Sequence, residues 1–144
     1  MDPIRSIPNT TFYVDTVRKN WDDCRSAAAN NGFAFASIQN ERENDAVADY
    51  LQSNSIWVVW LGGYQTSFDD EPAGNWAWLD GTPWTDSTYT NWYVDDYYFD
   101  GEWNQPDNGY YNDQHHLYQR SWRDGTWADG NKDWRYPCLF RDPT

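Results

Sequence analysis

Apolar and polar positions in the first part of the chain predict a strand followed by a helix. Residues 11–17 alternate in polarity and are rich in β-forming side chains, which is typical of a strand. Trp21, Cys24 and Ala28 then follow the i, i+3, i+7 spacing of one helix face. Asn20 precedes them and is a residue type that favours the start of a helix. We therefore expect a short helix over residues 20–31.

The same two patterns continue over the next thirty residues. Residues 33–38 predict a second short strand. Asn40 is expected to cap a second helix, with Glu43 as its capping-box partner. Residues 56–61 form an uninterrupted apolar run, which predicts a buried strand. The second helix is expected to bury the apolar stripe made by Ala46, Val47, Tyr50 and Leu51.

Regular periodicity is lost over residues 64–109, which are rich in Gly, Asp, Asn, Thr, Trp and Tyr. Long segments without regular structure are uncommon in compact domains and usually functional. Strand-like patterns return at residues 115–118 and 134–140. We therefore expect an α+β scaffold that brackets one long loop. Residues 1–10 are interpreted as a lead-in segment and residues 11–144 as the domain.

Charge and composition exclude several kinds of partner. The 144 residues carry a formal net charge of −13, which repels phosphate backbones and anionic lipid. No apolar run approaches the roughly 18 residues that a membrane-spanning helix needs. We expect neither nucleic-acid binding nor membrane insertion. The 11 Trp and 11 Tyr supply the apolar surface that the few aliphatic residues cannot, and their polar tips suit wet recognition surfaces.

Two cysteines, Cys24 and Cys138, lie near opposite ends of the chain. Their spacing fits neither a zinc site nor a thioredoxin motif. A single disulfide is the simplest interpretation and implies an oxidising, extracellular or secreted location. Two buried free thiols are the alternative. No secretory signal precedes Asp2, so we expect a trimmed mature domain or a module of a larger protein.

Seven stretches of the chain, in order, resemble the motifs of the C-type lectin-like domain. The resemblance covers residues 11–140, and the correct order makes it far more specific than any one match. The matching stretches are Trp21-Asp22-Asp23, residues 32–38, residues 41–51, Trp60-Leu61-Gly62-Gly63, residues 76–83 followed by Asn91-Trp92, Gln105-Pro106-Asp107 and residues 125–129.

The resemblance implies two helices flanking small antiparallel sheets, with a loop-within-a-loop that carries the ligand site. The family places its helical cysteine where Ala28 stands, four residues after Cys24. Its last cysteine would fall at Phe140, two residues after Cys138. A shift of four on a helix or two on a strand keeps the same face. The resemblance therefore implies a displaced Cys24–Cys138 disulfide.

The family's inner disulfide has no counterpart here. Its places fall at approximately His116 and Lys132, so the long loop is expected to be less restrained. His115 and His116 are interpreted as strand positions, because no further Cys or His stands at ligand spacing from them.

The triplet Gln105-Pro106-Asp107 resembles the galactose-type calcium and sugar motif of the family. Calcium binds six to eight oxygens, and Gln105 and Asp107 each offer one. In the family this proline is cis, which directs both neighbours at one ion, and a cis bond is plausible only at proline. Gln105 can also donate through its amide, whereas Asp107 can only accept. The sugar's vicinal hydroxyls would complete the site.

Two further calcium ligands are expected downstream. The count from Asp107 places the next ligand at Asp113, with Gln114 as the alternative. Asp129 matches the final ligand. Its neighbour in the family is Asn, but here it is Ala128, which removes one oxygen. Asn131 or a loop acid can substitute for it.

Aromatic residues near the triplet are candidates for stacking on a sugar ring. Tyr110 and Tyr111 follow the triplet and Trp103 precedes it. Such a ring would favour galactose by about 1 kcal/mol. Packing of the long loop is the alternative for each of them. Other tryptophans are assigned to the core rather than to recognition, namely Trp57, Trp60, Trp76, Trp78 and Trp92.

The acidic, aromatic segment 93–104 separates Asn91-Trp92 from the triplet. Crowded carboxylates repel one another unless a cation lies among them. The segment is interpreted as a wall of the binding site or a second calcium position, with a solvated acidic loop as the alternative. We expect at least one Ca²⁺.

These residues suggest three candidate functions. The first is calcium-dependent binding of galactose-like glycans by an extracellular recognition or adhesion module. The second is a calcium-independent protein- or ice-binding variant of the same fold with a decayed sugar site. The third, a glycosidase, is disfavoured because no carboxylate pair or nucleophile–base set stands out. Single lectin sites bind weakly, so a multidomain or multivalent parent protein is expected.

Overall fold

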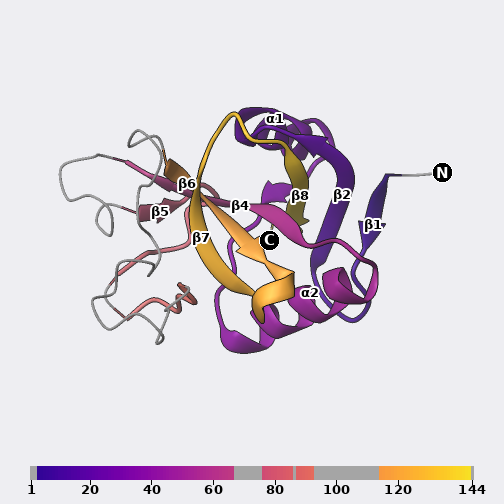
Figure 1. Ribbon diagram of the computed structural model, residues 1–144. Coiled ribbons are helices and arrows are strands. Elements are labelled where there is room, and N and C mark those ends of the chain that lie inside the picture. Colours follow the sequence, from indigo (N-terminus) through magenta and orange to yellow (C-terminus); the bar gives the residue numbers. More distant parts are fainter. Residues whose placement is uncertain (1–2, 67–75, 86, 93–113, 144) are drawn as a thin grey trace.

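One sheet of eight strands, formed by segments far apart in the sequence, carries the two helices. A computed structural model describes residues 3–66, 76–85, 87–92 and 114–143. The strand order is β1-β2-β8-β4-β6-β7, with β3 paired to β8 and β5 paired to β4 (Figure 1). The strands are β1 (Ile4–Ser6), β2 (Phe12–Lys19), β3 (Ala34–Phe35), β4 (Val58–Gln65), β5 (Trp76–Trp78), β6 (Gln114–Arg120), β7 (Thr126–Asn131) and β8 (Tyr136–Arg141).

Both helices begin where the sequence predicted, because an asparagine caps each of them. Helix α1 spans Trp21–Asn30, and the side chain of Asn20 accepts a hydrogen bond from the Asp23 amide at 2.8 Å. Helix α2 spans Glu41–Ser53, and Asn40 accepts from the Glu43 amide at 2.8 Å. A short 3₁₀ helix, η1 (Ser121–Arg123), joins β6 to β7.

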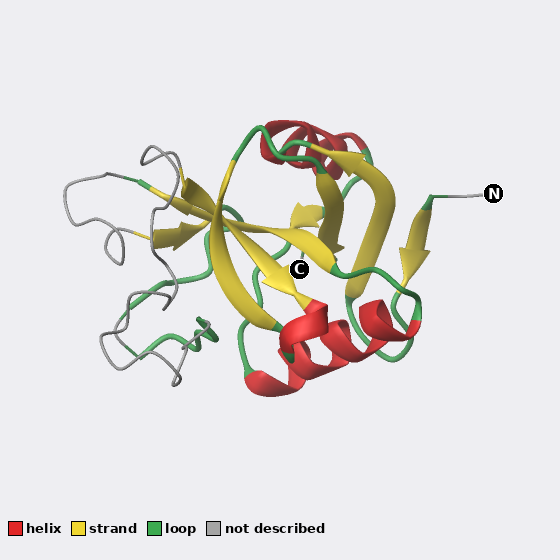
Figure 2. Cartoon of the chain, in the orientation of Figure 1, coloured by secondary structure: helices red, strands yellow, loops and turns green. Residues whose placement is uncertain are grey.

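The two helices cover opposite faces of the sheet (Figure 2). The first hydrophobic cluster contains Val47 and Leu51 of α2. The second contains Trp21 and Cys24 of α1. The expected α+β architecture, with two helices and a mixed sheet, is therefore present.

The predicted disulfide is present. Cys24 of α1 and Cys138 of β8 are bonded, with 5.6 Å between their Cα atoms. Both residues are fully buried in the second cluster. The disulfide joins residues 114 positions apart and so fixes the first helix to the last strand.

Three parts of the scaffold differ from the sequence-based expectation. Residues 4–6, expected within an irregular lead-in, form strand β1, which pairs antiparallel with β2. Strand β5, within the segment without periodicity, pairs with β4 and was not predicted. The strand expected over 33–38 is limited to β3. The Ala36 amide still donates a hydrogen bond to Leu139 O at 3.0 Å, a distance typical of paired strands. Pairing with neighbouring strands determines whether such short segments form strands, because a few residues are too short to show a periodic pattern.

Gly62 is required by close backbone approach rather than by a turn. A Cβ atom at this position would lie 2.5 Å from the carbonyl oxygen of Phe35. The Gly62 amide donates to Ala36 O at 2.8 Å, which holds β4 against the segment after β3. Within the described part of the chain, no helix is long and apolar enough to span a membrane.

Candidate functional site

The described residues include only part of the predicted ligand site. Asp129 lies in β7 and Gln114 begins β6, where only the backbone of Gln114 is described. The remaining predicted metal- and sugar-binding residues, and the acidic segment 93–104, lie outside the described residues. These predictions therefore stay predictions for Trp103, Gln105, Asp107, Tyr110, Tyr111 and Asp113.

Asp129 is placed where strands β6 and β7 run side by side. It pairs with Leu117, and two positions further along β7 Asn131 pairs with Gln114. The Asp129 side chain is buried, with 1% of its surface exposed. The register therefore brings the first residue of β6 next to the end of β7 that carries Asp129.

Ala128 occupies the position where the resemblance expects an asparagine. It is fully buried and pairs with Tyr118 of β6. The nearby Asn131 is half-buried, and its Oδ1 accepts a hydrogen bond from the Asp133 amide at 2.9 Å. Within the described ranges no group of three or more His, Cys, Asp or Glu side chains is arranged to hold a metal ion.

Six aromatic rings from β5, β7 and the chain after β5 pack against one another, and we call them the loop-base cluster. Trp127 is fully buried and lies 5.5 Å from Trp78 and 6.2 Å from Trp92 between ring centroids. A parallel bridge joins Trp92 to Trp127, and the Trp127 amide donates to Asn91 O at 2.7 Å. The cluster fixes residues 76–92 against β7. Its members are Trp76, Trp78, Trp84, Tyr89, Trp92 and Trp127.

A buried asparagine of α2 connects this cluster to the scaffold. Asn44 is fully buried, and its Oδ1 accepts from Trp127 Nε1 at 2.8 Å and from Gln119 Nε2 at 2.9 Å. Its Nδ2 donates to Gly125 O at 3.0 Å, and Asn91 Nδ2 donates to the same carbonyl at 2.9 Å. Asn44 therefore joins α2 to β6 and β7, and the shared Gly125 carbonyl links Asn91 to the same network.

A second polar network fixes the turn after β5. Asp80 accepts a hydrogen bond from Ser37 Oγ at 2.5 Å and from the Thr82 amide at 2.9 Å. Arg141 donates to Ser37 O at 2.8 Å and pairs with Glu43 at 3.2 Å. Glu43 also accepts from the Gln39 amide at 2.7 Å, so the capping partner of α2 is part of the same network. The conformation of this turn is thus set by the start of α2 and the end of β8.

His116 and Lys132, the places of the missing inner disulfide, line one cavity of about 190 Å³. His115 and His116 lie in β6, as predicted. The His116 ring lies 4.5 Å from the ring of Trp21, and burial lowers its pKa from 6.5 to about 4. His116 is therefore neutral at physiological pH, and its partly buried ring packs against Trp21.

Of the five tryptophans that the sequence assigned to the core, four are buried or packed against it and one is not. Trp60, Trp76 and Trp78 are buried, and Trp92 packs against the first cluster. The assignment of Trp57 was wrong, because 49% of its surface is exposed. Trp57 directly precedes β4, so it lies outside the stretch that the sheet and α2 cover.

Asn44 was not identified from the sequence, although a signal for it was present. Residues 44, 47, 48 and 51 follow helical spacing, and all four are buried on one face of α2. A polar residue within a buried helical stripe requires hydrogen-bond partners. That spacing could have marked Asn44 as the centre of a buried network.

Comparison with known proteins establishes the family. The model of the family "Lectin C-type domain" matches residues 17–139. The chain therefore belongs to the C-type lectin domain family.

Three similar proteins illustrate the range of this family. The secretory phospholipase A2 receptor of Pongo abelii is 36% identical over 73 residues, which cover 51% of this chain and 4% of the receptor. The C-type lectin CEL-I from Cucumaria echinata has a TM-score of 0.69 at 16% identity, covering 97% of this chain and 94% of that one. A calcium-independent type II antifreeze protein has a TM-score of 0.67 at 20% identity, covering 97% and 91%. At these identities the two structures establish the fold alone.

Proposed function

We propose that this domain is an extracellular recognition or adhesion module that binds galactose-type carbohydrate through Ca²⁺. Gln105, Asp107, Asp113 and Asp129 would supply oxygens to the ion, as the family resemblance implies. The sugar's hydroxyls would complete the coordination. The proposal depends most on Asp129, whose buried carboxylate is fixed in β7 beside the start of β6.

The support for this assignment is that the scaffold holds Asp129 and the residues before position 93 in place. The β6–β7 pairing and the loop-base cluster fix Asp129 and residues 76–92 before any ligand binds. Preorganised ligands lower the entropic cost of binding. Stacking and hydrogen bonding to the sugar are assigned to Trp103, Tyr110, Tyr111 and Gln114.

Retention on immobilised galactose tests the proposal. The wild-type domain is expected to be retained in 5 mM calcium (about tenfold above a Kd in the extracellular range) and released by EDTA. Asp107→Ala should abolish retention, because it removes a metal ligand and a sugar acceptor together. Asp49→Ala, an exposed carboxylate on α2, is the matched control and should be retained. Equal retention of Asp107→Ala and wild type would contradict the proposal.

A second candidate function is favoured by Ala128. A buried methyl group stands where the resemblance expects an oxygen ligand, and this weakens a calcium site. The fold is shared with a calcium-independent type II antifreeze protein. A calcium-independent protein- or ice-binding module would show thermal hysteresis or partner binding that is unchanged by EDTA. It would show no retention on galactose.

The proposal also places the domain in an oxidising, extracellular location and in a larger, multidomain protein. The Cys24–Cys138 disulfide is stable in extracellular rather than cytosolic conditions. The chain spans only 4% of the receptor that it matches, which is consistent with one module among many. Several copies in one protein would raise the avidity of weak single sites.

A further inference from the structure

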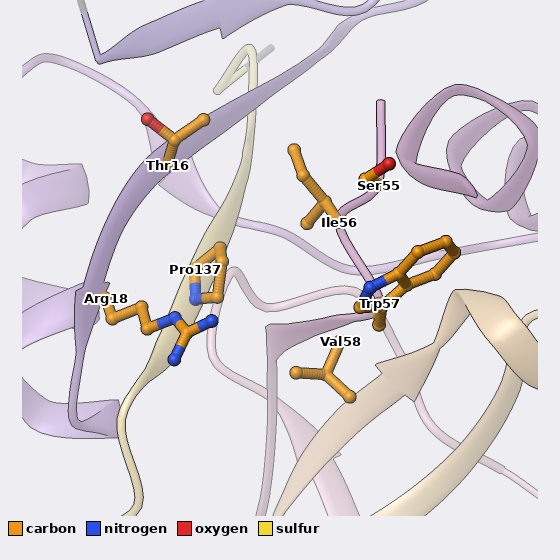
Figure 3. Close-up of a pocket in the computed structure, with 7 residues that line it drawn as sticks. All are labelled: Thr16, Arg18, Ser55, Ile56, Trp57, Val58 and Pro137. Carbon is orange, nitrogen blue, oxygen red and sulfur yellow. The ribbon is translucent and has the colours of Figure 1, made fainter. Parts of the chain in front are cut away.

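A shallow pocket of about 180 Å³ lies where strand β4 begins. Strand β5 pairs with Gly63–Gln65 at the far end of β4, whereas Val58, the first residue of β4, lines this pocket. Figure 3 shows side chains from β2, from β8 and from the segment that follows α2 around one hollow. This region has no part in the calcium site proposed above.

The rim of the pocket consists of hydrogen-bond donors. Arg18 on β2 is exposed, and within the described residues it forms no ion pair. Trp57, on the other side of Pro137 and Val58 in Figure 3, is half-exposed. A guanidinium and an indole N–H donate but cannot accept. The complementary ligand group is therefore rich in acceptors and anionic.

Arg18 is one of several arginines that form no ion pair among the described residues. The chain has 23 acidic residues against 10 Lys and Arg. Lys19 pairs with Asp15 at 2.7 Å, and Arg141 pairs with Glu43 at 3.2 Å. Arg18 lies beside Lys19 in the sequence and has no such partner among the described residues. It is available to an anion from outside.

The floor of the pocket is apolar. Ile56, Val58 and Pro137 line it between Arg18 and Trp57 (Figure 3). Pockets for drug-sized ligands have volumes of about 300–1,000 Å³, so this smaller pocket fits a single ring. The C–H face of a sugar ring packs against apolar and aromatic surface, as Trp57 and the floor provide. Shape and polarity together indicate one sugar ring that bears an acidic group.

Ser55 follows the C-cap of α2 and has a φ of +59°, the left-handed conformation in which many helices end. The serine places a hydroxyl on the rim of the pocket, where glycine would place none. The carbonyls at this end of α2 already accept the amides of Asn54, Ser55 and Ile56.

We propose that this pocket is a second, calcium-independent binding site for an acidic sugar unit, with a carboxylate or sulfate on a single pyranose ring. Arg18 binds the acidic group, and the Ser55 hydroxyl and the Trp57 indole N–H donate to ring or acid oxygens. The ring lies over Ile56 and Pro137. The site is independent of calcium and of Asp107.

Nuclear magnetic resonance titration in EDTA tests the ligand class. The probes are methyl β-glucuronide, galactose 6-sulfate, the neutral methyl β-glucoside and acetate. One of the acidic sugars is expected to shift the side-chain N–H signal of Trp57 and to bind at least tenfold more tightly than the neutral glycoside. Comparing the carboxylated with the sulfated sugar distinguishes the two acids. Equal binding of the neutral glycoside, or of acetate, would overturn the proposal.

Matched variants test the location. Arg18→Gln is expected to lower the affinity for the acidic sugar at least tenfold, to that of the neutral glycoside. Arg25→Gln, an exposed arginine on α1, should leave it unchanged. Trp57→Phe should weaken binding, whereas Trp122→Phe, at 46% exposure a comparable tryptophan outside the pocket, should not. Unchanged affinity in Arg18→Gln would overturn the proposal whatever the outcome of the galactose experiment.

Discussion

The two faces of the sheet are stabilised in different ways. On the α1 face, the Cys24–Cys138 disulfide joins helix to strand within a cluster of buried rings. On the α2 face, Asn44 and the loop-base cluster connect the helix to β7 and to residues 76–92 by hydrogen bonds and ring contacts. The covalent bond therefore joins the first helix to the last strand, and non-covalent packing holds β7, with Asp129, and residues 76–85 and 87–92 in place.

This difference explains how the domain tolerates the absence of the inner disulfide. His116 and Lys132 stand at the two positions of that disulfide. The neutral His116 ring packs against Trp21, and the Lys132 carbonyl accepts a hydrogen bond from the Trp21 amide at 2.9 Å. Ring contacts also fix the described residues 76–85 and 87–92 against β7. Damage to either face should destabilise the domain, but only damage to the α2 face should also disturb the proposed calcium site.

Removal of the disulfide is expected to have the largest effect on stability. The bond closes a loop of 114 residues, for which chain-entropy reasoning gives a loss of about 5 kcal/mol in the double variant Cys24→Ala/Cys138→Ala. Urea unfolding of the variant and of reduced wild-type protein measures it. A loss below about 2 kcal/mol would show that the α1 face does not depend on its covalent link.

Asn44→Ala should lower the free energy of unfolding, measured by urea unfolding, by about 3 kcal/mol. The substitution leaves Trp127 Nε1, Gln119 Nε2 and the Gly125 carbonyl without this hydrogen-bond partner. Each buried group left in this way costs roughly 1–3 kcal/mol, and the individual costs do not simply add. Asn54→Ala is the matched control, because Asn54 is exposed and its side chain bonds only Tyr50 O; its effect should stay below about 0.5 kcal/mol. Similar losses in both variants would refute the role assigned to the α2 face.

The sequence predicted the elements that carry strong local signals. Asn20 and Asn40 cap the helices as expected, and the shifted cysteines form the expected bond. Strands β1 and β5 were missed because three-residue strands depend on their partners and not on their own pattern. Trp57 was misassigned because composition does not distinguish a tryptophan at the edge of the sheet from one within it. At the candidate site, only the placement of Asp129 on a buried strand could be compared with the structure.

Acidification should weaken the α1 face through His116. Its pKa is about 4 in the folded protein and about 6.5 when unfolded, so between these values the unfolded chain binds more protons. Stability is therefore complete above pH 6.5 and falls as the pH decreases towards 4, by about 2 kcal/mol at pH 5. Urea unfolding of wild type and His116→Gln at pH 7.5 and 5 measures this loss. An equal loss in the variant would show that another group is responsible.

The most direct test of the central claim, that the α2 face bears a calcium-dependent sugar site, is thermal unfolding with calcium or EDTA. At a calcium concentration tenfold above Kd, binding should stabilise the folded domain by about 1.4 kcal/mol and raise Tm by a few degrees. Galactose should raise Tm further, only in calcium. Asp129→Asn is expected to lose the calcium-dependent increment. An identical Tm in calcium and EDTA for the wild-type domain would contradict the account.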